Sequence, residues 1–109
     1  MVNVYNPDSW VVLRMTHKDQ IIYKVLGGWS SDYLNGSSWR LNSGIEHVEQ
    51  DGDYYKFIGS SGSVYNCHKD SYGLRMSTAG IWDGMKNKYP DQVELLDDCD
   101  WTKFDFGNI

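Results

Sequence analysis

Cys67 and His68 are the neighbours in this 109-residue chain whose types first suggest catalysis. A cysteine thiol becomes a nucleophile when a nearby base or positive charge converts it to a thiolate. Successive residues of a strand point to opposite faces, however, so the two side chains meet only if Cys67 ends its strand. A free cysteine is also commonly a small buried hydrophobic residue. We therefore predict no catalytic residue and no enzyme activity, with a small cysteine- or metal-dependent enzyme centred on this pair as the alternative.

Metal and nucleotide sites have weak support in the sequence. The histidines and cysteines match neither Cys-x-x-Cys nor His-x-x-x-His spacing, and the glycine pairs lack the lysine of a phosphate loop. The carboxylates of residues 97–105 could attract a hard cation, but this run lacks the glycine and terminal glutamate of an EF-hand. We predict a solvated acidic tail, no metal site and no cofactor. Cys67 and Cys99 are expected to be reduced thiols, because the chain has no signal peptide.

Two polar and aromatic segments, 29–38 and 68–75, are the best candidates for a working surface. Binding loops use Tyr, Trp, Ser, Gly and Asn, since rigid aromatic rings supply contact area at small entropy cost. Binding residues are also common on loops that a rigid scaffold holds. The alternative is that these aromatic residues close the ends of a small barrel. Because Trp, Tyr and Arg dominate interface energetics, we predict a protein interface anchored by Trp29, Tyr33, Tyr72 and Arg75.

The net charge of −5 and the pI near 4.9 argue against direct nucleic-acid binding, which depends on clustered Lys and Arg. No apolar run approaches the roughly 20 residues that span a bilayer, so no membrane partner is expected. A chain of this length suits one domain over residues 1–109. Exposed sheet edges leave a homodimer open as an alternative to a monomer.

The segment 45–67 organises the fold prediction. Asp-Gly at 51–52 is a strong signal for a two-residue hairpin turn, which places Val48 opposite Tyr55. Side chains alternate across a strand, so Val48, Tyr55 and Phe57 share the face that we assign to the core. Glu46 does not fit that face, and it either lies at the sheet margin or marks a bulge. A turn at 59–62 then adds a third strand, with Val64 beside Phe57.

Further strands come from alternating apolar residues. Trp39 and Leu41 alternate within a short strand and are expected in the core. The expected strands are 9–16 and 20–26, joined as a hairpin by a polar turn at 17–19, a short strand at 39–42 and an edge strand at 93–96, whereas 1–7 is an irregular or edge segment.

One helix is expected after the strands, starting with Ser77 or Thr78 as its cap and ending before Pro90. Gly80 and Gly84 are expected to let it approach the sheet closely. Its apolar stripe consists of Ile81, Trp82, Met85 and Tyr89. Trp101 or Phe104 then holds the C-terminal segment, which frays from Gly107. These elements predict an α+β fold: a curved antiparallel sheet or small SH3-like barrel of five to six strands with one helix.

The stretches GGWSSDYLNGSSWRLNSGI, DYYKFIGSSGSVYNCHK and YGLRMSTAGIWD resemble a family of small uncharacterised proteins encoded by tailed phages of marine cyanobacteria. The resemblance covers most of the chain and implies a virus-encoded protein made in a bacterial host cytoplasm. It carries over no site residue, since the family has no assigned activity. We predict a non-enzymatic accessory protein that binds an unknown protein of host or phage. An acidic decoy of a host nucleic-acid-binding protein is an alternative, motivated by the negative charge.

Overall fold

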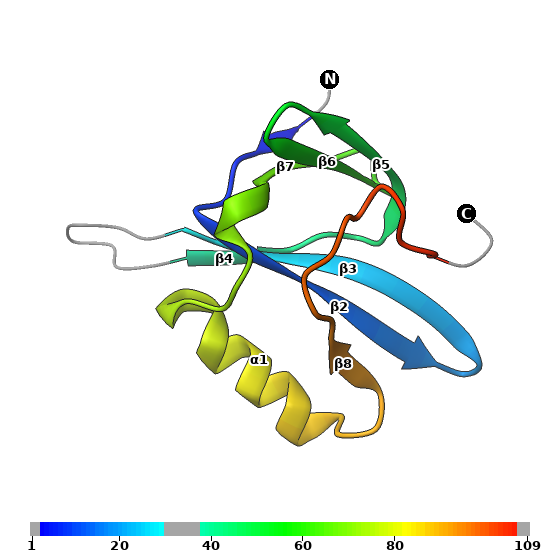
Figure 1. The fold of residues 1–109 in the computed structure, drawn as a ribbon. Coiled ribbons are helices and arrows are strands. Elements are labelled where there is room, and N and C mark those ends of the chain that lie inside the picture. The colour runs from blue at the N-terminus through cyan, green and yellow to red at the C-terminus, as the bar shows by residue number, and fades with distance from the viewer. Residues whose placement is uncertain (1–2, 30–37, 107–109) are drawn as a thin grey trace.

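The structure, a computed structural model, describes residues 3–29 and 38–106, without the side chains of Met76 and Ser77. The described residues form two four-stranded sheets, a 3₁₀ helix and one α-helix (Figure 1). The first sheet has the order β1 (Val4–Tyr5), β7 (Val64–His68), β6 (Tyr54–Gly59) and β5 (Ile45–Asp51). The second has the order β4 (Ser38–Leu41), β3 (Gln20–Trp29), β2 (Ser9–His17) and β8 (Val93–Leu95). The helices are η1 (Lys69–Ser71) and α1 (Met76–Lys88).

The broad α+β prediction is confirmed, whereas the prediction of a single five- to six-stranded sheet or SH3-like barrel is not. The eight strands of the described residues divide into two sheets that do not close into a barrel. The short strands β1 and β8 account for part of the difference. Each pairs with a strand far away in sequence, β1 in parallel with β7 and β8 antiparallel with β2. Sequence patterns identify local hairpins more readily than such long-range pairs.

The fold has three layers, in which the first sheet and α1 cover opposite faces of the second sheet (Figure 1). Trp10 and Val12 of β2 are buried between the two sheets. Val11 and Leu13 are buried on the other face, where the residues of α1 pack against them. Both faces of β2 are therefore covered. Trp10 in particular is a central core residue with no exposed surface.

The hairpin of β5 and β6 keeps its predicted faces but shifts its register by two residues. Val48 lies opposite Phe57 rather than Tyr55, because the two-residue turn is 52–53 and Gly52 adopts a φ of +61°. Side chains along a strand alternate between the two faces of the sheet, so a register shift of two residues leaves each side chain on its predicted face. Tyr55 and Phe57 are buried as predicted. The register shift at Glu46 confirms the bulge that its sequence position suggested, and it leaves this carboxylate exposed.

The other strand predictions hold with small changes. The hairpin of β2 and β3 turns through Lys18 and Asp19, which both have positive φ. The third strand of the meander is β7, in which Val64 lies opposite Ile58 rather than beside Phe57. The edge strand β8 is also confirmed. Trp39 is not in the core, since 47% of its surface is exposed on the edge strand β4.

Helix α1 packs by Ile81, Trp82 and Met85, as its apolar stripe predicts. Its N-cap residue is Arg75 rather than Ser77 or Thr78, and the hydroxyl of Thr78 accepts a hydrogen bond from the Arg75 N–H at 3.0 Å. The predicted close approach through Gly80 and Gly84 is wrong. A Cβ added at either glycine would meet no atom within 4 Å, so both face away from the sheet.

The C-terminal segment after β8 returns across the open side between the two sheets (Figure 1). Trp101 is completely buried in the inter-sheet core, which confirms its predicted anchoring role. Its ring lies 6.2 Å from Trp10 and 5.2 Å from Phe104, centre to centre. Gly107, where fraying was expected, lies outside the described residues. The acidic tail is therefore tied to the core by a large apolar side chain.

Candidate binding groove

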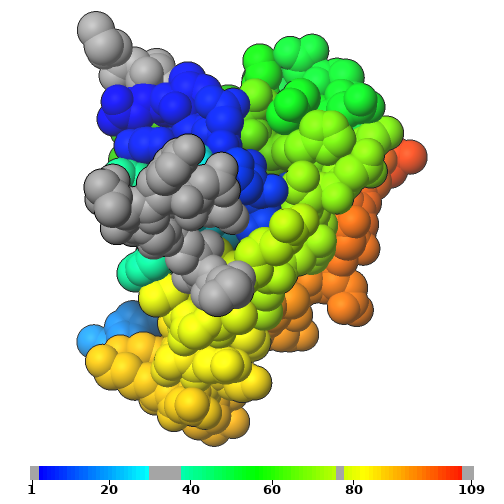
Figure 2. All heavy atoms as spheres, turned by 90° about the vertical axis from the view of Figure 1, so that its left-hand side faces the viewer, coloured from blue at the N-terminus to red at the C-terminus, as the bar shows by residue number. Residues whose placement is uncertain are grey.

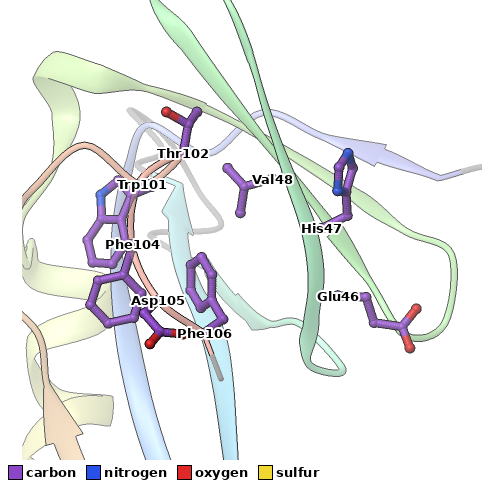
Figure 3. A pocket seen from close by; sticks show the side chains of 8 residues that line it. All are labelled: Glu46, His47, Val48, Trp101, Thr102, Phe104, Asp105 and Phe106. Atoms are coloured by element: carbon purple, nitrogen blue, oxygen red, sulfur yellow. The ribbon is translucent and has the colours of Figure 1, made fainter. Parts of the chain in front are cut away.

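A groove of about 290 Å³ lies between β5 and the C-terminal segment. Figure 3 shows its two sides: β5 carries Val48 on one side, and the rings of Phe104 and Phe106 lie on the other. These sides come from parts of the chain about half its length apart. The residues that line the groove are Glu46, His47, Val48, Trp101, Thr102, Phe104, Asp105 and Phe106.

The apolar side of the groove is an aromatic cluster built around Trp101. Phe104 and Phe106 stand edge to face at 4.7 Å between ring centres, and both also contact Tyr23 of β3. Edge-to-face aromatic pairs add to the free energy that burial of their area supplies. Because Trp101 itself is fully buried, the partly buried Phe104 and Phe106 are the rings that a bound molecule would meet.

A second hollow of about 250 Å³ adjoins the groove and shares Glu46 and Phe106 with it. Its outer side is the tip of the β2–β3 hairpin, where Ile21 is 57% and Ile22 is 37% exposed. Contiguous exposed apolar surface is uncommon on a protein and often marks an interaction site. The two hollows together make a longer apolar depression, which we call the β5 groove.

Acidic groups lie along the rim of the β5 groove. Glu46 and Asp105 line it directly. The rim therefore carries negative charge at neutral pH. A positively charged partner would be favoured there.

Strand β5 presents backbone groups beside the groove. Asp51 and Tyr54 flank the two-residue turn and are hydrogen-bonded to each other through their backbones. Along an antiparallel ladder, hydrogen-bonded and non-hydrogen-bonded residue pairs alternate, so the pairs that contain Val48 and Gln50 are of the non-hydrogen-bonded kind. The N–H and C=O groups of Val48 and Gln50 consequently point away from β6. Within the described residues, β5 is the edge of its sheet on that side. An exposed edge of this kind can pair with an additional strand.

The three predicted interface anchors that the structure describes, Trp29, Tyr72 and Arg75, lie in different surroundings. Tyr33 lies outside the described residues. Trp29 is partly buried, donates its indole N–H to the Asn6 carbonyl at 2.9 Å and touches the ring of Tyr5. Arg75 is exposed at the start of α1. Figure 2 shows the face on which the N-terminal segment (blue) lies above α1 (yellow). The binding role of the four residues stays a prediction.

Tyr72 has a structural role that the sequence analysis missed. Its hydroxyl accepts a hydrogen bond from the Val12 N–H at 3.0 Å and donates one to the Leu96 carbonyl at 2.5 Å. Its ring lies 4.8 Å from that of Trp10. Burial raises the pKa of Tyr72, so the hydroxyl keeps its proton at neutral pH. Tyr72 thus links β2 to the chain after β8 and contacts the aromatic core.

Cys67 and His68 do not form a nucleophile and base. Cys67 is fully buried in the core, where burial raises the pKa of its thiol well above the ordinary value. His68 points the other way, stacks edge to face against Tyr54 and accepts a hydrogen bond from the Asp70 N–H. An inaccessible, protonated thiol is a poor nucleophile. This geometry argues against the alternative of a cysteine-dependent enzyme.

The two thiols are expected to differ sharply in reactivity. Brief treatment of the native protein with iodoacetamide should alkylate the exposed Cys99 and leave the buried Cys67 unmodified. Intact mass followed by peptide mapping measures the two sites separately. Treatment in denaturant is the control and should modify both. Rapid alkylation of Cys67 in the native protein would contradict its burial and revive a catalytic role.

Two further searches of the described residues gave negative findings. No group of three or more His, Cys, Asp or Glu side chains in residues 3–29 and 38–106 is placed to hold a metal ion. No helix in the described part of the chain is long and apolar enough to cross a membrane. The carboxylates of residues 97–105 therefore do not gather, with those of other described segments, into a ligand set.

The groove could not be predicted from the sequence, because one side comes from the middle of the chain and the other from its C-terminal segment. One available signal was the composition of the tail, in which Trp101, Phe104 and Phe106 are more apolar than a solvated acidic segment requires. Comparison with known proteins adds no further guide. No family model matches the chain, no curated protein matches it, and no solved structure matches it.

Proposed function

We propose that the chain is a non-enzymatic protein-interaction module that binds an extended, basic and apolar segment of a partner protein in the β5 groove. The observation that carries this proposal is a groove lined by apolar and acidic side chains beside β5, which is the edge strand of its sheet among the described residues. An extended segment can add itself to such an edge as another strand. Main-chain hydrogen bonds then supply affinity, and the side chains that enter the groove supply specificity.

The alternation of a strand predicts the chemistry of the partner. A segment paired with Val48 and Gln50 would present every second side chain to the groove, where Val48 and Phe106 favour apolar groups. The intervening side chains would lie beside the outer face of β5. That face carries Glu49 and Asp51, which favour Lys or Arg. A segment that alternates apolar and basic residues satisfies both faces.

The test uses a short synthetic peptide of alternating valine and lysine, labelled for fluorescence anisotropy. It is expected to bind the native protein, whereas a peptide of alternating valine and glutamate is not. Gln50→Pro removes an edge N–H without touching the β5–β6 ladder and is expected to weaken binding roughly tenfold. Glu46→Lys is expected to weaken binding through charge repulsion at the groove.

Asp91→Lys is the matched control, because it makes the same charge change at an exposed site away from the β5 groove. It should leave peptide binding nearly unchanged. Circular dichroism and a melting curve establish that each variant is folded. Equal binding of the two peptides, or full binding by Gln50→Pro, would show that no strand adds to β5 and would end the proposal.

The resemblance to phage proteins sets the biological context of this proposal. It suggests an accessory protein that acts in a bacterial host cytoplasm on a protein of host or phage. A homodimer formed through β5 is an alternative outcome, and the valine–lysine peptide would then compete with self-association in light scattering. The acidic decoy has no separate structural observation in its favour.

A further inference from the structure

A different pocket, of about 260 Å³, opens where the chain leaves β4 and passes the turn between β6 and β7. We call it the serine pocket. Ser61 donates its N–H to the Ser43 hydroxyl at 2.9 Å, and the oxygens of these two hydroxyls are 3.2 Å apart. The polar residues that line it include Arg40, Asn42, Ser43, Ser61, Ser63 and Tyr65. It is therefore rich in hydrogen-bond donors that come from several elements of the fold.

The charge of the serine pocket is opposite to that of the whole protein. Arg40 and Lys24 line it, and no aspartate or glutamate of residues 3–29 and 38–106 does so. The β5 groove, by contrast, is lined by the carboxylates of Glu46 and Asp105. A local pair of cations in a chain of net charge −5 is a specific feature of this pocket. Its lining favours an anion.

Arg40 is held in place beside the tyrosines of the pocket. Its guanidinium carbon lies 4.5 Å from the centre of the Tyr5 ring, and the Tyr5 and Tyr65 rings are 5.1 Å apart. Burial raises the pKa of Tyr65 to about 12, although the charge of Arg40 acts in the opposite direction. The Tyr65 hydroxyl is consequently protonated at neutral pH. It is a donor in the same pocket as the guanidinium.

Asn42 adds a buried donor at the same place. Only 3% of this residue is exposed, and its side-chain oxygen accepts a hydrogen bond from the Val25 N–H at 2.8 Å. Its side-chain nitrogen has no hydrogen-bond partner in the part of the chain that the structure describes. Buried polar groups are nearly always paired, so this amide has an unused donor beside the pocket.

We infer that the serine pocket binds a phosphate group, either free phosphate or the phosphate of a small monoester. Phosphate carries a charge between about −1.5 and −2, which matches the two cations of the lining. A carboxylate can be satisfied by a guanidinium alone through two parallel hydrogen bonds. Several donors in one pocket, from Arg40, the serine hydroxyls and Tyr65, suit an anion with three terminal oxygens better. This pocket shares Ser43 with the second hollow of the β5 groove, but the rest of its lining is different, and the inference does not depend on the function of the groove.

The test is a titration of the purified full chain with inorganic phosphate, methyl phosphate and acetate, followed by calorimetry at low ionic strength. Phosphate or methyl phosphate is expected to bind saturably and more tightly than acetate. Arg40→Met and Tyr65→Phe should each weaken that binding by roughly tenfold or more, since each removes a donor to a charged ligand. Tyr65→Phe keeps the ring, so the packing of the core is preserved.

Arg14→Met is the matched control, because Arg14 is also exposed but pairs with Glu94 on another part of the surface. It should bind phosphate like the unchanged protein. Tighter binding of methyl phosphate than of inorganic phosphate would identify a site for phosphate monoesters. Tighter binding of inorganic phosphate would identify a site for the free ion. Three outcomes overturn the inference: no saturable binding of either phosphate, acetate binding as tightly, or equal loss of binding in Arg14→Met and Arg40→Met.

Discussion

Replacing Trp101 by alanine is expected to lower the free energy of unfolding by roughly 3–5 kcal/mol. The indole ring is completely buried between the two sheets and contacts Trp10, Phe57 and Phe104. Its removal leaves a cavity and releases the C-terminal segment that forms one side of the β5 groove. Small domains are stabilised by only about 5–15 kcal/mol, so a large share of the stability should be lost.

Urea denaturation followed by circular dichroism measures this loss. Trp39→Ala is the matched control, because Trp39 is the same residue type on an exposed edge strand, and it should change stability by less than about 1 kcal/mol. Similar effects of the two substitutions would mean that the tail does not anchor in the core. The β5 groove would then lose its aromatic side, and the proposed function with it.

Replacing Tyr72 by alanine is expected to cost roughly 2–4 kcal/mol of stability, through lost ring packing and two lost hydrogen bonds. Tyr72→Phe keeps the ring and should cost roughly 1–3 kcal/mol, because the Val12 N–H and the Leu96 carbonyl lose their partner. Thermal and urea unfolding of both variants separate the two contributions.

This measurement also decides between two roles for Tyr72. A binding anchor on a loop could be truncated with little change in melting temperature, whereas a core residue could not. Arg75→Ala is the comparison, because Arg75 is a predicted anchor that is exposed. If Tyr72→Ala melts like the unchanged protein, the hydrogen bonds to β2 and to the chain after β8 do not stabilise the fold, and the interface role regains support.

Local patterns in the sequence were sufficient for the hairpins and for the helix. Asp51-Gly52 marked a turn, and alternation placed Tyr55 and Phe57 in the core even though the register was two residues off. This success has a physical reason: turn chemistry and side-chain period act over a few residues, so they are visible in a short window. The bulge at Glu46 could be anticipated for the same reason, because a charge interrupted the buried face.

The division into two sheets and both candidate sites depended on the tertiary structure. Nothing near Phe106 in the sequence indicates that it lies across a groove from Val48. Likewise, nothing near Arg40 indicates that it lines the same pocket as Tyr65. Tyr72 belongs to a segment with the composition of a binding loop, but its ring packs against Trp10 and Trp101 of the core. These two residues lie far from Tyr72 in the chain, so the sequence around Tyr72 does not reveal the contact. The sequence alone determined which segments are strands and which form the helix. Contacts between distant segments decided which polar and aromatic side chains face each other across a groove, since burial depends on what packs from elsewhere in the chain.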